Sequence, residues 1–352
     1  MESAPLDFLK SLLDTPSPSG FERPVQDLVR RYAASFADRV TTDRHGNVFV
    51  VNNPDASLRL MFAGHCDQIG LLVQHIDADG FLYAQTIGGW DPQVLIGQKM
   101  LVWSDGGPIA GIIARKPIHL LNDEERKQVV KLKDLWIDIG AKNKDDAAAL
   151  IKVGDPITME LGFRPMLNNM ASATAMDDKC GLWVCLEAAR RAAAKGLRCA
   201  LHAVSTVQEE IGLRGAVTAA YTVDPHVGIA VDVTHATDCP TIDKKSEGDV
   251  KLGAGPVVYR GPNMNPVVVE RLMRVAEAAQ IPVQPAASGR ATGTDANTMQ
   301  IARGGVATGL VSIPNRYMHS PVEMISLDDI DRAADLLAAF ALDLKPDDEF
   351  IP

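Results

Sequence analysis

The N-terminal part of the chain has the pattern of two helices separated by a turn. In residues 1–14, apolar side chains recur at helical spacing, so this segment predicts an amphipathic helix. A Pro- and Ser-rich turn follows at 15–22, and its Ser19 or Gly20 is suited to start a second helix that ends near Phe36. The chain is therefore expected to begin with two helices.

Strand-like runs come next, and the pattern changes after the second of them. The runs 47–52 and 58–65 are apolar enough to be buried strands. From 69 to 164, short β-branched runs alternate with Gly, Asp and Pro turns, a pattern typical of an all-β module. One acidic segment within it, 141–155, has helical character. We therefore assign residues 69–164 to an inserted β-rich domain.

The last part of the chain, from 165 onward, alternates helices with strands. Such alternation predicts a mostly parallel sheet with helices on both faces. The predicted fold is an α/β domain, formed by residues 1–68 and 165–352, that is interrupted by the insert. The predicted helices lie near 181–195, 212–221, 266–280 and 327–343, and the predicted strands near 200–207 and 226–233.

Composition narrows the class of protein. The chain has 352 residues, of which 46% are hydrophobic and 23% charged, as in soluble globular proteins. Its net charge of −10 argues against nucleic acid or an anionic membrane as a partner, and no apolar run reaches the roughly 18 residues that span a bilayer. The N-terminus lacks the pattern of a signal peptide, and the five cysteines form no CxxC pair. We therefore expect a cytoplasmic protein with free thiols.

A histidine and an aspartate stand two positions apart at the end of a predicted strand. His65 and Asp67 leave that strand on the same face, because side chains alternate along a strand. The Asp67 carboxylate is then able to accept a hydrogen bond from one ring nitrogen while the other nitrogen stays free for a metal. Alone, this pair is equally consistent with polar loop residues at a strand end.

Acidic residues recur at three further strand ends or helix starts. Asp177 and Asp178 precede a glycine and a long helix, where one aspartate serves as an N-cap and the second is left without that explanation. Glu209 and Glu210 follow an apolar strand, and two adjacent like charges there need either solvent or a cation. Asp232 ends another apolar strand, where an unpaired carboxylate is costly.

Taken together, these residues predict a pair of divalent cations. His319 adds a second histidine after a turn rich in Pro and Asn. Two histidines and several carboxylates at the C-terminal edge of an α/β sheet suit zinc, cobalt or manganese. The charges of Asp177, Glu210 and Asp232, with a bridging hydroxide, balance two such ions. Glu209 is then the spare carboxylate beside the water, which is the position of a general base.

The ordered motifs GHCD, MDDK, QEEIG, VDVTHA and HSPVE resemble the M42 family of metallo-aminopeptidases, which includes tetrahedral, glutamyl and deblocking aminopeptidases. The resemblance extends over essentially the whole chain, including GAKNKDDAAALIKVGDPIT in the insert and GTDAN at 293–297. The insert lies between the first and second ligand motifs. In carboxypeptidase-like relatives the extra domain falls before the last motif, so its position here favours the M42 family.

The resemblance implies a role for each motif. Asp177 would bridge two metals, His65 and Asp232 would complete one site, and Glu210 and His319 would complete the other.

Further roles follow from the same resemblance. Glu209 would be the general base and Asp67 the acid that orients the histidine. Asp178 follows the bridging aspartate at a point where relatives bend the backbone sharply. Asp178, His235 and Asp295 are candidates for contact with substrate, whereas His202, inside an apolar strand, is expected to be a buried structural histidine.

The resemblance also implies an activity and an assembly. The protein would remove residues from the N-termini of peptides, with a metal-bridging hydroxide as the nucleophile. The insert would be a β-barrel dimerisation domain, and dimers would assemble into a dodecameric shell that admits unfolded peptides.

Two other functions fit part of the sequence. A metal-independent glycoside hydrolase would use Glu209 and Glu210 as acid and base, but adjacent residues are poorly placed to stand about 5–9 Å apart across a sugar. That function also leaves the histidines unexplained. A non-catalytic assembly or binding protein would keep the metal site as a relic, and the intact Glu209 argues against it.

Overall fold

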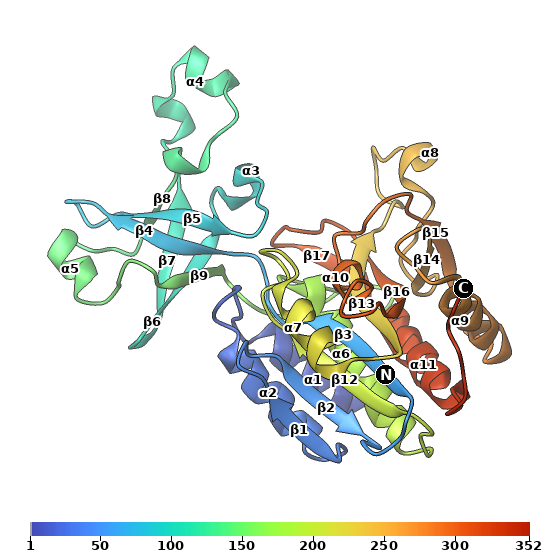
Figure 1. Cartoon of the computed structure of the whole chain (residues 1–352). Coiled ribbons are helices and arrows are strands. Elements are labelled where there is room, and N and C mark those ends of the chain that lie inside the picture. Colours follow the sequence, from blue (N-terminus) through green and yellow to red (C-terminus); the bar gives the residue numbers. More distant parts are fainter. Residues whose placement is uncertain (1) are drawn as a thin grey trace.

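The computed structural model describes residues 2–352, which form a large α/β body and a β-rich lobe projecting from it (Figure 1). Each of the two parts has a hydrophobic core of its own. The strands of the lobe close into a barrel, whereas those of the body form an open sheet. The predicted fold, an α/β domain with an inserted β-barrel-like module, is therefore confirmed.

An eight-stranded sheet forms the centre of the body. In spatial order its strands are β1 (Arg39–Thr42), β2 (Val48–Asn52), β12 (Ala200–Thr206), β3 (Arg59–His65), β13 (Val227–His235), β16 (Ala307–Asn315), β14 (Val257–Arg260) and β15 (Gln284–Ala287). The four central strands, from β12 to β16, run parallel to one another. Antiparallel pairs join β2 and β14 to this centre. The sheet is thus mixed, and the predicted parallel order holds for its core.

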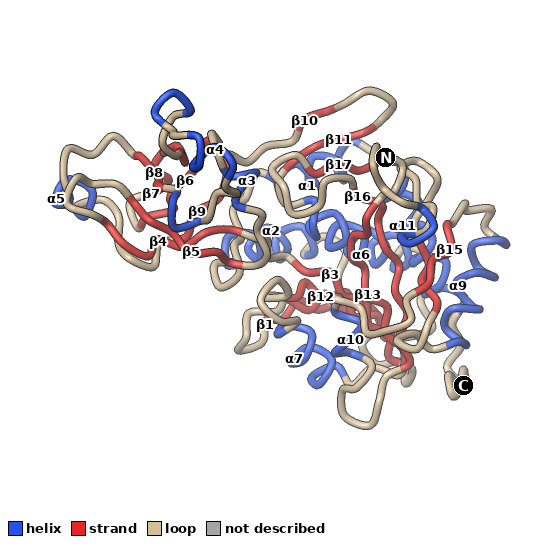
Figure 2. The backbone as a smooth tube through the Cα atoms, turned by 90° about the horizontal axis from the view of Figure 1, so that it is seen from above, coloured by secondary structure: helices blue, strands red, loops and turns tan. Residues whose placement is uncertain are grey.

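Helices cover both faces of this sheet (Figure 2). The central one is α6 (Met176–Ala193), which packs on β3 and β13 and is buried nearly all round. Two further helices of the body also contact it, so it lies inside the layered fold. The remaining helices of the body are α1 (Ser3–Leu13), α2 (Arg23–Ala33), α7 (Arg214–Val223), α8 (Lys244–Glu247), α9 (Pro266–Ala278), α10 (Asp295–Met299) and α11 (Leu327–Asp343).

The second helix starts later than its sequence suggested. It begins at Arg23, with Glu22 at the N-cap position, and not at Ser19 or Gly20. Gly20 has a φ of 91°, which a helix does not accommodate, and the Ser19 hydroxyl donates a hydrogen bond to Asp67. A tertiary contact therefore overrides the local helix-start signal.

The lobe is a closed barrel of six strands. They are β4 (Gly70–Ile76), β5 (Leu82–Ile87), β8 (Trp136–Asp138), β7 (Gly107–Ala114), β6 (Lys99–Ser104) and β9 (Pro156–Met159). Its short helices are α3 (Pro92–Leu95), α4 (Asp123–Lys127) and α5 (Lys144–Ala148). Only α5 is helical within the segment 141–155. Closure leaves the barrel without a free sheet edge.

A small antiparallel sheet links the last part of the chain to the start of α6. It contains β10 (Arg164–Pro165), β11 (Met170–Ala173) and β17 (Glu323–Ser326). Because β11 leads into α6 and β17 follows His319, this sheet brings both segments to one place. None of the helices in residues 2–352 combines the length and the apolar character needed to cross a membrane.

Candidate active site

The C-terminal ends of parallel strands bring the predicted site residues together. His65 ends β3 and pairs in register with Thr206, the last residue of β12. Glu209 and Glu210 follow β12 directly, and Asp232 lies on the neighbouring strand β13. This edge is where ligands bind in open α/β sheets. The sequence prediction of a shared edge therefore agrees with the positions of these four side chains.

Close packing between β3 and α6 adds the aspartate from the helix. A Cβ atom on Gly64 would lie 2.7 Å from the backbone nitrogen of Leu182, a distance at which the helix would have to move away. Glycine at this position lets the N-terminal part of α6 approach the strand end. Asp177, the second residue of α6, then reaches His65, with 3.1 Å between Oδ1 and Nε2.

The carboxylate of Asp177 lies between the two predicted histidine ligands. Its Oδ1 is 3.1 Å from Nε2 of His65, and its Oδ2 is 3.2 Å from Nε2 of His319. One carboxylate with a histidine at each oxygen is the arrangement expected of a residue that spans two cations.

The potential ligand atoms at this edge form two groups, and the Asp177 carboxylate belongs to one of them. In each group, one atom from every residue lies within 4.8 Å of the others, as an ion between them requires. The first group consists of His65, Glu209 and Asp232, and the second of Asp177, Glu210 and His319.

Electrostatics favours a cation among these buried acids. Burial raises the pKa of Glu209, Glu210 and Asp232 well above the ordinary values, and neighbouring carboxylates raise it further. Burial opposes charge on Asp177 as well, but hydrogen bonds with His319 and His65 hold its pKa below the usual range. The Oε1 atom of Glu210 is buried and has no hydrogen-bond partner among the described residues. Divalent cations would satisfy that atom and keep all four acids ionised, so the donor set fits a metal.

The predicted role of Asp67 needs a refinement. The nearest acceptor to Nδ1 of His65 is the backbone carbonyl of Asp67 at 3.1 Å, while its carboxylate Oδ1 is 3.5 Å away. That carboxylate instead accepts hydrogen bonds from the backbone N–H groups of Glu209 (3.0 Å) and Glu210 (3.2 Å). Asp67 therefore contacts the glutamate pair as well as the histidine.

The three candidates for substrate contact differ in their surroundings. Asp178 is fully buried, and its oxygens accept hydrogen bonds from the backbone N–H groups of His65 and Gly181; the peptide bond before it is cis. His235 is exposed at the end of β13. Asp295 is 2% exposed, accepts a 2.6 Å hydrogen bond from the Thr206 hydroxyl and has a pKa raised to about 6 by burial. Contact of any of these with substrate stays a prediction.

Residues that the sequence analysis passed over also border the site. The insert approaches the second ligand group through a pair of glycines between β5 and α3. A Cβ atom on Gly88 would lie 3.4 Å from Oε2 of Glu210, and one on Gly89 would lie 3.5 Å from Nδ1 of His319. The two adjacent glycines of the segment IGGW at 87–90 are the sequence feature that could have indicated a close approach of this backbone to the site. The contacts of Glu323, in the quoted motif HSPVE, were not foreseen either.

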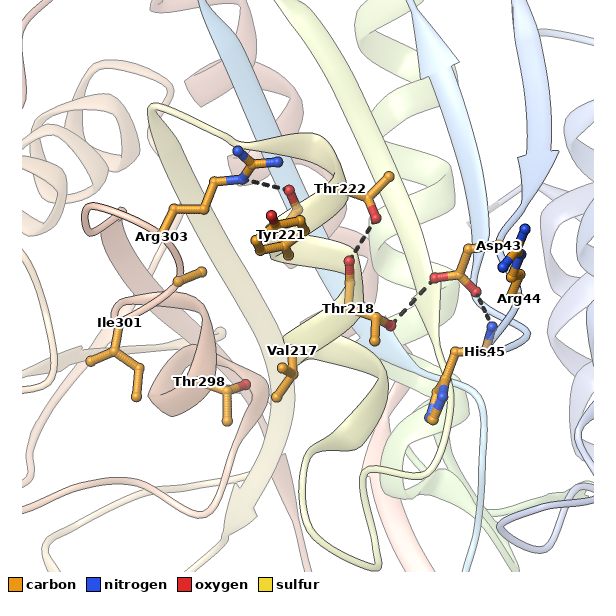
Figure 3. A pocket seen from close by; sticks show the side chains of 11 residues that line it. Asp43, Arg44, His45, Val217, Thr218, Tyr221, Thr222, Thr298, Ile301 and Arg303 are labelled. Carbon is orange, nitrogen blue, oxygen red and sulfur yellow. Dashed lines mark hydrogen bonds between the residues drawn. The ribbon is translucent and has the colours of Figure 1, made fainter.

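A separate hollow lies away from these residues. It has a volume of about 740 Å³ and lies between α7, the segment after α10 and the turn before β2 (Figure 3). Val217, Tyr221 and Ile301 give it an apolar wall, and Asp43 and Thr218 form a hydrogen-bonded rim. None of the predicted site residues lines it. Asp43 and His45 also line it, but both groups of potential metal-ligand atoms found among the described residues lie at the sheet edge.

Comparison with known proteins identifies the family of this chain. The family model described as M42 glutamyl aminopeptidase matches residues 46–336. The lysyl aminopeptidase of Pyrococcus furiosus is 37% identical, over 97% of this chain and 98% of the relative. The glutamyl aminopeptidase of Lactococcus lactis is 30% identical, over 96% of each chain.

Solved structures give the same result. The TET aminopeptidase of a marine-sediment Thaumarchaeota archaeon superposes with a TM-score of 0.93 at 37% identity, covering 97% of both chains. The family model covers most of the chain, and relatives at 30% identity or more span nearly all of it. This chain therefore belongs to the M42 family of aminopeptidases.

Proposed function

We propose that this protein is a di-metal aminopeptidase whose two ions share Asp177. His65 and Asp232 would hold one ion, and Glu210 and His319 the other. The observation that carries the proposal is the Asp177 carboxylate, which has a histidine Nε2 atom 3.1 Å from one oxygen and another 3.2 Å from the second. Nitrogen and oxygen donors of this kind suit zinc, cobalt or manganese.

Glu209 is the residue that we assign as the general base. Two divalent ions held at this site would polarise the scissile carbonyl and lower the pKa of water. The Oε2 atom of Glu209 lies 3.8 Å from Nε2 of His65, so the carboxylate is next to the ligands proposed for the first ion. Burial raises its pKa well above the ordinary value, as is common for a carboxylate that acts in an active site. Glu209 would take a proton from the attacking water and deliver it to the leaving amine.

The proposed substrates are peptides with a free N-terminus. An α-ammonium group suits a site in which several carboxylates are buried together. The relatives named as lysyl and glutamyl aminopeptidases differ in the side chain at the cleaved position. Both names contain aminopeptidase, which supports removal of N-terminal residues as the shared reaction, while the difference leaves the preferred side chain open to measurement.

Assembly into a homo-oligomer is the second part of the proposal. A TET1 peptidase from Pyrococcus horikoshii, which has a TM-score of 0.86 and 31% identity over 97% of this chain and all of its own, is described as assembling into a tetrahedron or a large octahedral shell. The barrel carries exposed apolar residues such as Ile112, Ile118 and Leu120, which a partner subunit would cover. We infer dimers joined through the barrel that form a dodecamer. All five cysteines are free thiols, which supports a reducing cytoplasm as the place of action.

The direction of attack tests the activity. The metal-loaded protein is incubated with one short peptide in three forms: unblocked, amidated at the C-terminus and acetylated at the N-terminus. Free amino acids should appear in order from the N-terminus of the first two forms. Acetylation should slow cleavage by about 10- to 150-fold, through loss of a charge-assisted hydrogen bond. Release from the C-terminus, abolished by amidation, would contradict the proposal.

A further inference from the structure

The turn between α1 and α2 packs against the catalytic edge, although it lies far from it in the sequence. Ser17 and Gln68 exchange backbone and side-chain hydrogen bonds, and Pro18 forms a parallel bridge with Gln68. Lys179 of α6 donates hydrogen bonds to the carbonyl of Thr15 (2.6 Å) and to Oε1 of Gln68 (2.7 Å). The turn is therefore fixed from both sides next to the segment that contains His65 and Asp67.

Ser19 in this turn contacts Asp67 directly. Its hydroxyl donates a 2.6 Å hydrogen bond to Oδ2 of Asp67. Ser19 is 5% exposed and Asp67 is fully buried, so water does not replace this donor freely.

The Asp67 carboxylate also accepts hydrogen bonds from the backbone of the glutamate pair. Its Oδ1 accepts the backbone N–H of Glu209 at 3.0 Å, and its Oδ2 accepts that of Glu210 at 3.2 Å. The same Oδ2 atom thus receives both the Ser19 hydroxyl and an amide of the loop after β12. A buried carboxylate with three donors has one preferred orientation, and that orientation fixes where both glutamates leave the backbone.

A second contact from the same turn supports the start of this loop. Oε1 of Glu22 accepts the backbone N–H of Gln208 at 3.2 Å and that of Gly20 at 2.8 Å. Gln208 has a φ of 56°, in the left-handed region that non-glycine residues seldom occupy. The turn therefore binds the loop on both sides of Glu209, once directly and once through Asp67.

We propose that Ser19 is a positioning residue for the catalytic glutamates, acting through Asp67, with Glu22 as a second support at Gln208. This inference rests on the function proposed above for Glu209. Ser19 touches neither substrate nor metal in this proposal. It fixes the carboxylate that in turn fixes the backbone of the base, so that Ser19 and Glu22, which precede α2, also help to hold the catalytic glutamates.

The test compares Ser19→Ala with Ser17→Ala in the full-length protein. Ser17 is an equally buried serine of the same turn, but its hydroxyl donates to the carbonyl of Cys66 at 2.7 Å and not to Asp67. In the metal-free protein, hydrogen exchange of the segment 207–213 is measured by mass spectrometry. Ser19→Ala should accelerate exchange there about tenfold, because the acceptor of both glutamate amides loses its fixed orientation. Ser17→Ala should leave this exchange as in the parent.

Turnover supplies the second readout. In the metal-loaded protein, Ser19→Ala should lower kcat by about 10- to 100-fold with little change in KM, the scale of residues that orient others. In an Asp67→Asn background, Ser19→Ala should lower kcat much less, because the carboxylate through which Ser19 acts is already absent. Equal effects of Ser17→Ala and Ser19→Ala on exchange and kcat would overturn the proposal, as would full additivity with Asp67→Asn. Glu209→Gln in the same assay tests the base separately from the positioning residue. If Glu209→Gln stays active, the proposed role of Glu209 as the base is wrong, whatever the result for Ser19→Ala.

Discussion

Oε2 of Glu323 accepts a 3.0 Å hydrogen bond from the backbone N–H of Asp177, the residue that lies between the two histidines. Oε1 of the same side chain accepts a 2.9 Å hydrogen bond from the backbone N–H of His319. Glu323 is 2% exposed, and it follows His319 by only four positions while Asp177 lies far away in the chain. One buried carboxylate thus fixes the backbone of two residues in the second ligand group.

This contact predicts that Glu323→Gln weakens metal binding. The amide keeps one acceptor oxygen and places an NH₂ group opposite a backbone N–H, so one of the two hydrogen bonds is lost. We expect metal affinity to fall by about 10- to 100-fold, the usual effect of removing a group that orients ligands. Competition with a chelator of known affinity measures it. Glu160→Gln, at an exposed glutamate on the insert, is the control, and equal affinities for the two variants would contradict the assignment.

The two adjacent glutamates are predicted to differ in kind. Glu209→Gln should keep its metal ions and bind substrate, but lose about 10²–10⁴-fold in kcat, the range for a positioned acid–base group. Glu210→Gln should first lose metal affinity, because it removes a charged ligand oxygen from the second group. Steady-state kinetics and metal analysis of both variants decide the matter. The opposite pattern would exchange their roles, since Glu209 also lies among the atoms of the first group.

Metal content is predicted to approach two divalent ions per chain in gently purified protein. His319→Ala should lose about one of them, because the second group then keeps only two carboxylates. His75→Ala, which changes an exposed histidine of the barrel, should keep both ions. Elemental analysis by mass spectrometry measures the content. A single ion that persists in His319→Ala would exclude the two-ion arrangement.

The lowered pKa of His202 predicts a loss of folding stability in mild acid. Burial, with help from nearby Arg39 and Arg59, lowers its pKa from 6.5 to about 4. Between these values the unfolded chain binds a proton that the folded chain does not, so the free energy of unfolding falls as the pH falls. The loss from this residue should reach about 3 kcal/mol near pH 4.

Denaturant unfolding at neutral pH and near pH 4.5 checks this prediction. His202→Gln carries no titrating ring, so it should lose less stability than the parent over this interval. His45→Gln changes an exposed histidine and should behave as the parent does. The explanation is wrong if all three proteins lose the same free energy.

The sequence predicted that the candidate site residues meet at one edge of the sheet because its signals are local. Strands β3, β12 and β13 are apolar runs that end in polar residues, and parallel order makes such ends meet at one edge. Strand β16 was missed, since its run ATGLVSIPN contains Pro314 and ends in an asparagine that both resemble turn signals. The antiparallel strand β14 is only four residues long and lacks a clear alternation of apolar and polar positions.

The supporting contacts were missed for a different reason. Ser19 has the local signal of a helix start, but its hydroxyl binds Asp67, a partner 48 positions away. Glu323 and Asp177 are 146 positions apart. A periodic pattern reports which face of an element is buried, and it contains no term for a hydrogen bond between distant segments. Residues that hold a site in place are therefore harder to predict than those that form it.

Strands β3 and β12 pair residue by residue, from Arg59 with Ala200 to His65 with Thr206, although the whole barrel lies between them in the chain. Their pairing closes a very long loop, and such closures slow folding through their entropic cost. A compact barrel, with its own core, would shorten the flexible part of that loop. We expect the barrel to become protected first in pulse-labelled hydrogen exchange during refolding. The catalytic edge, which exists only where these strands meet, would then be among the last parts of the molecule to form.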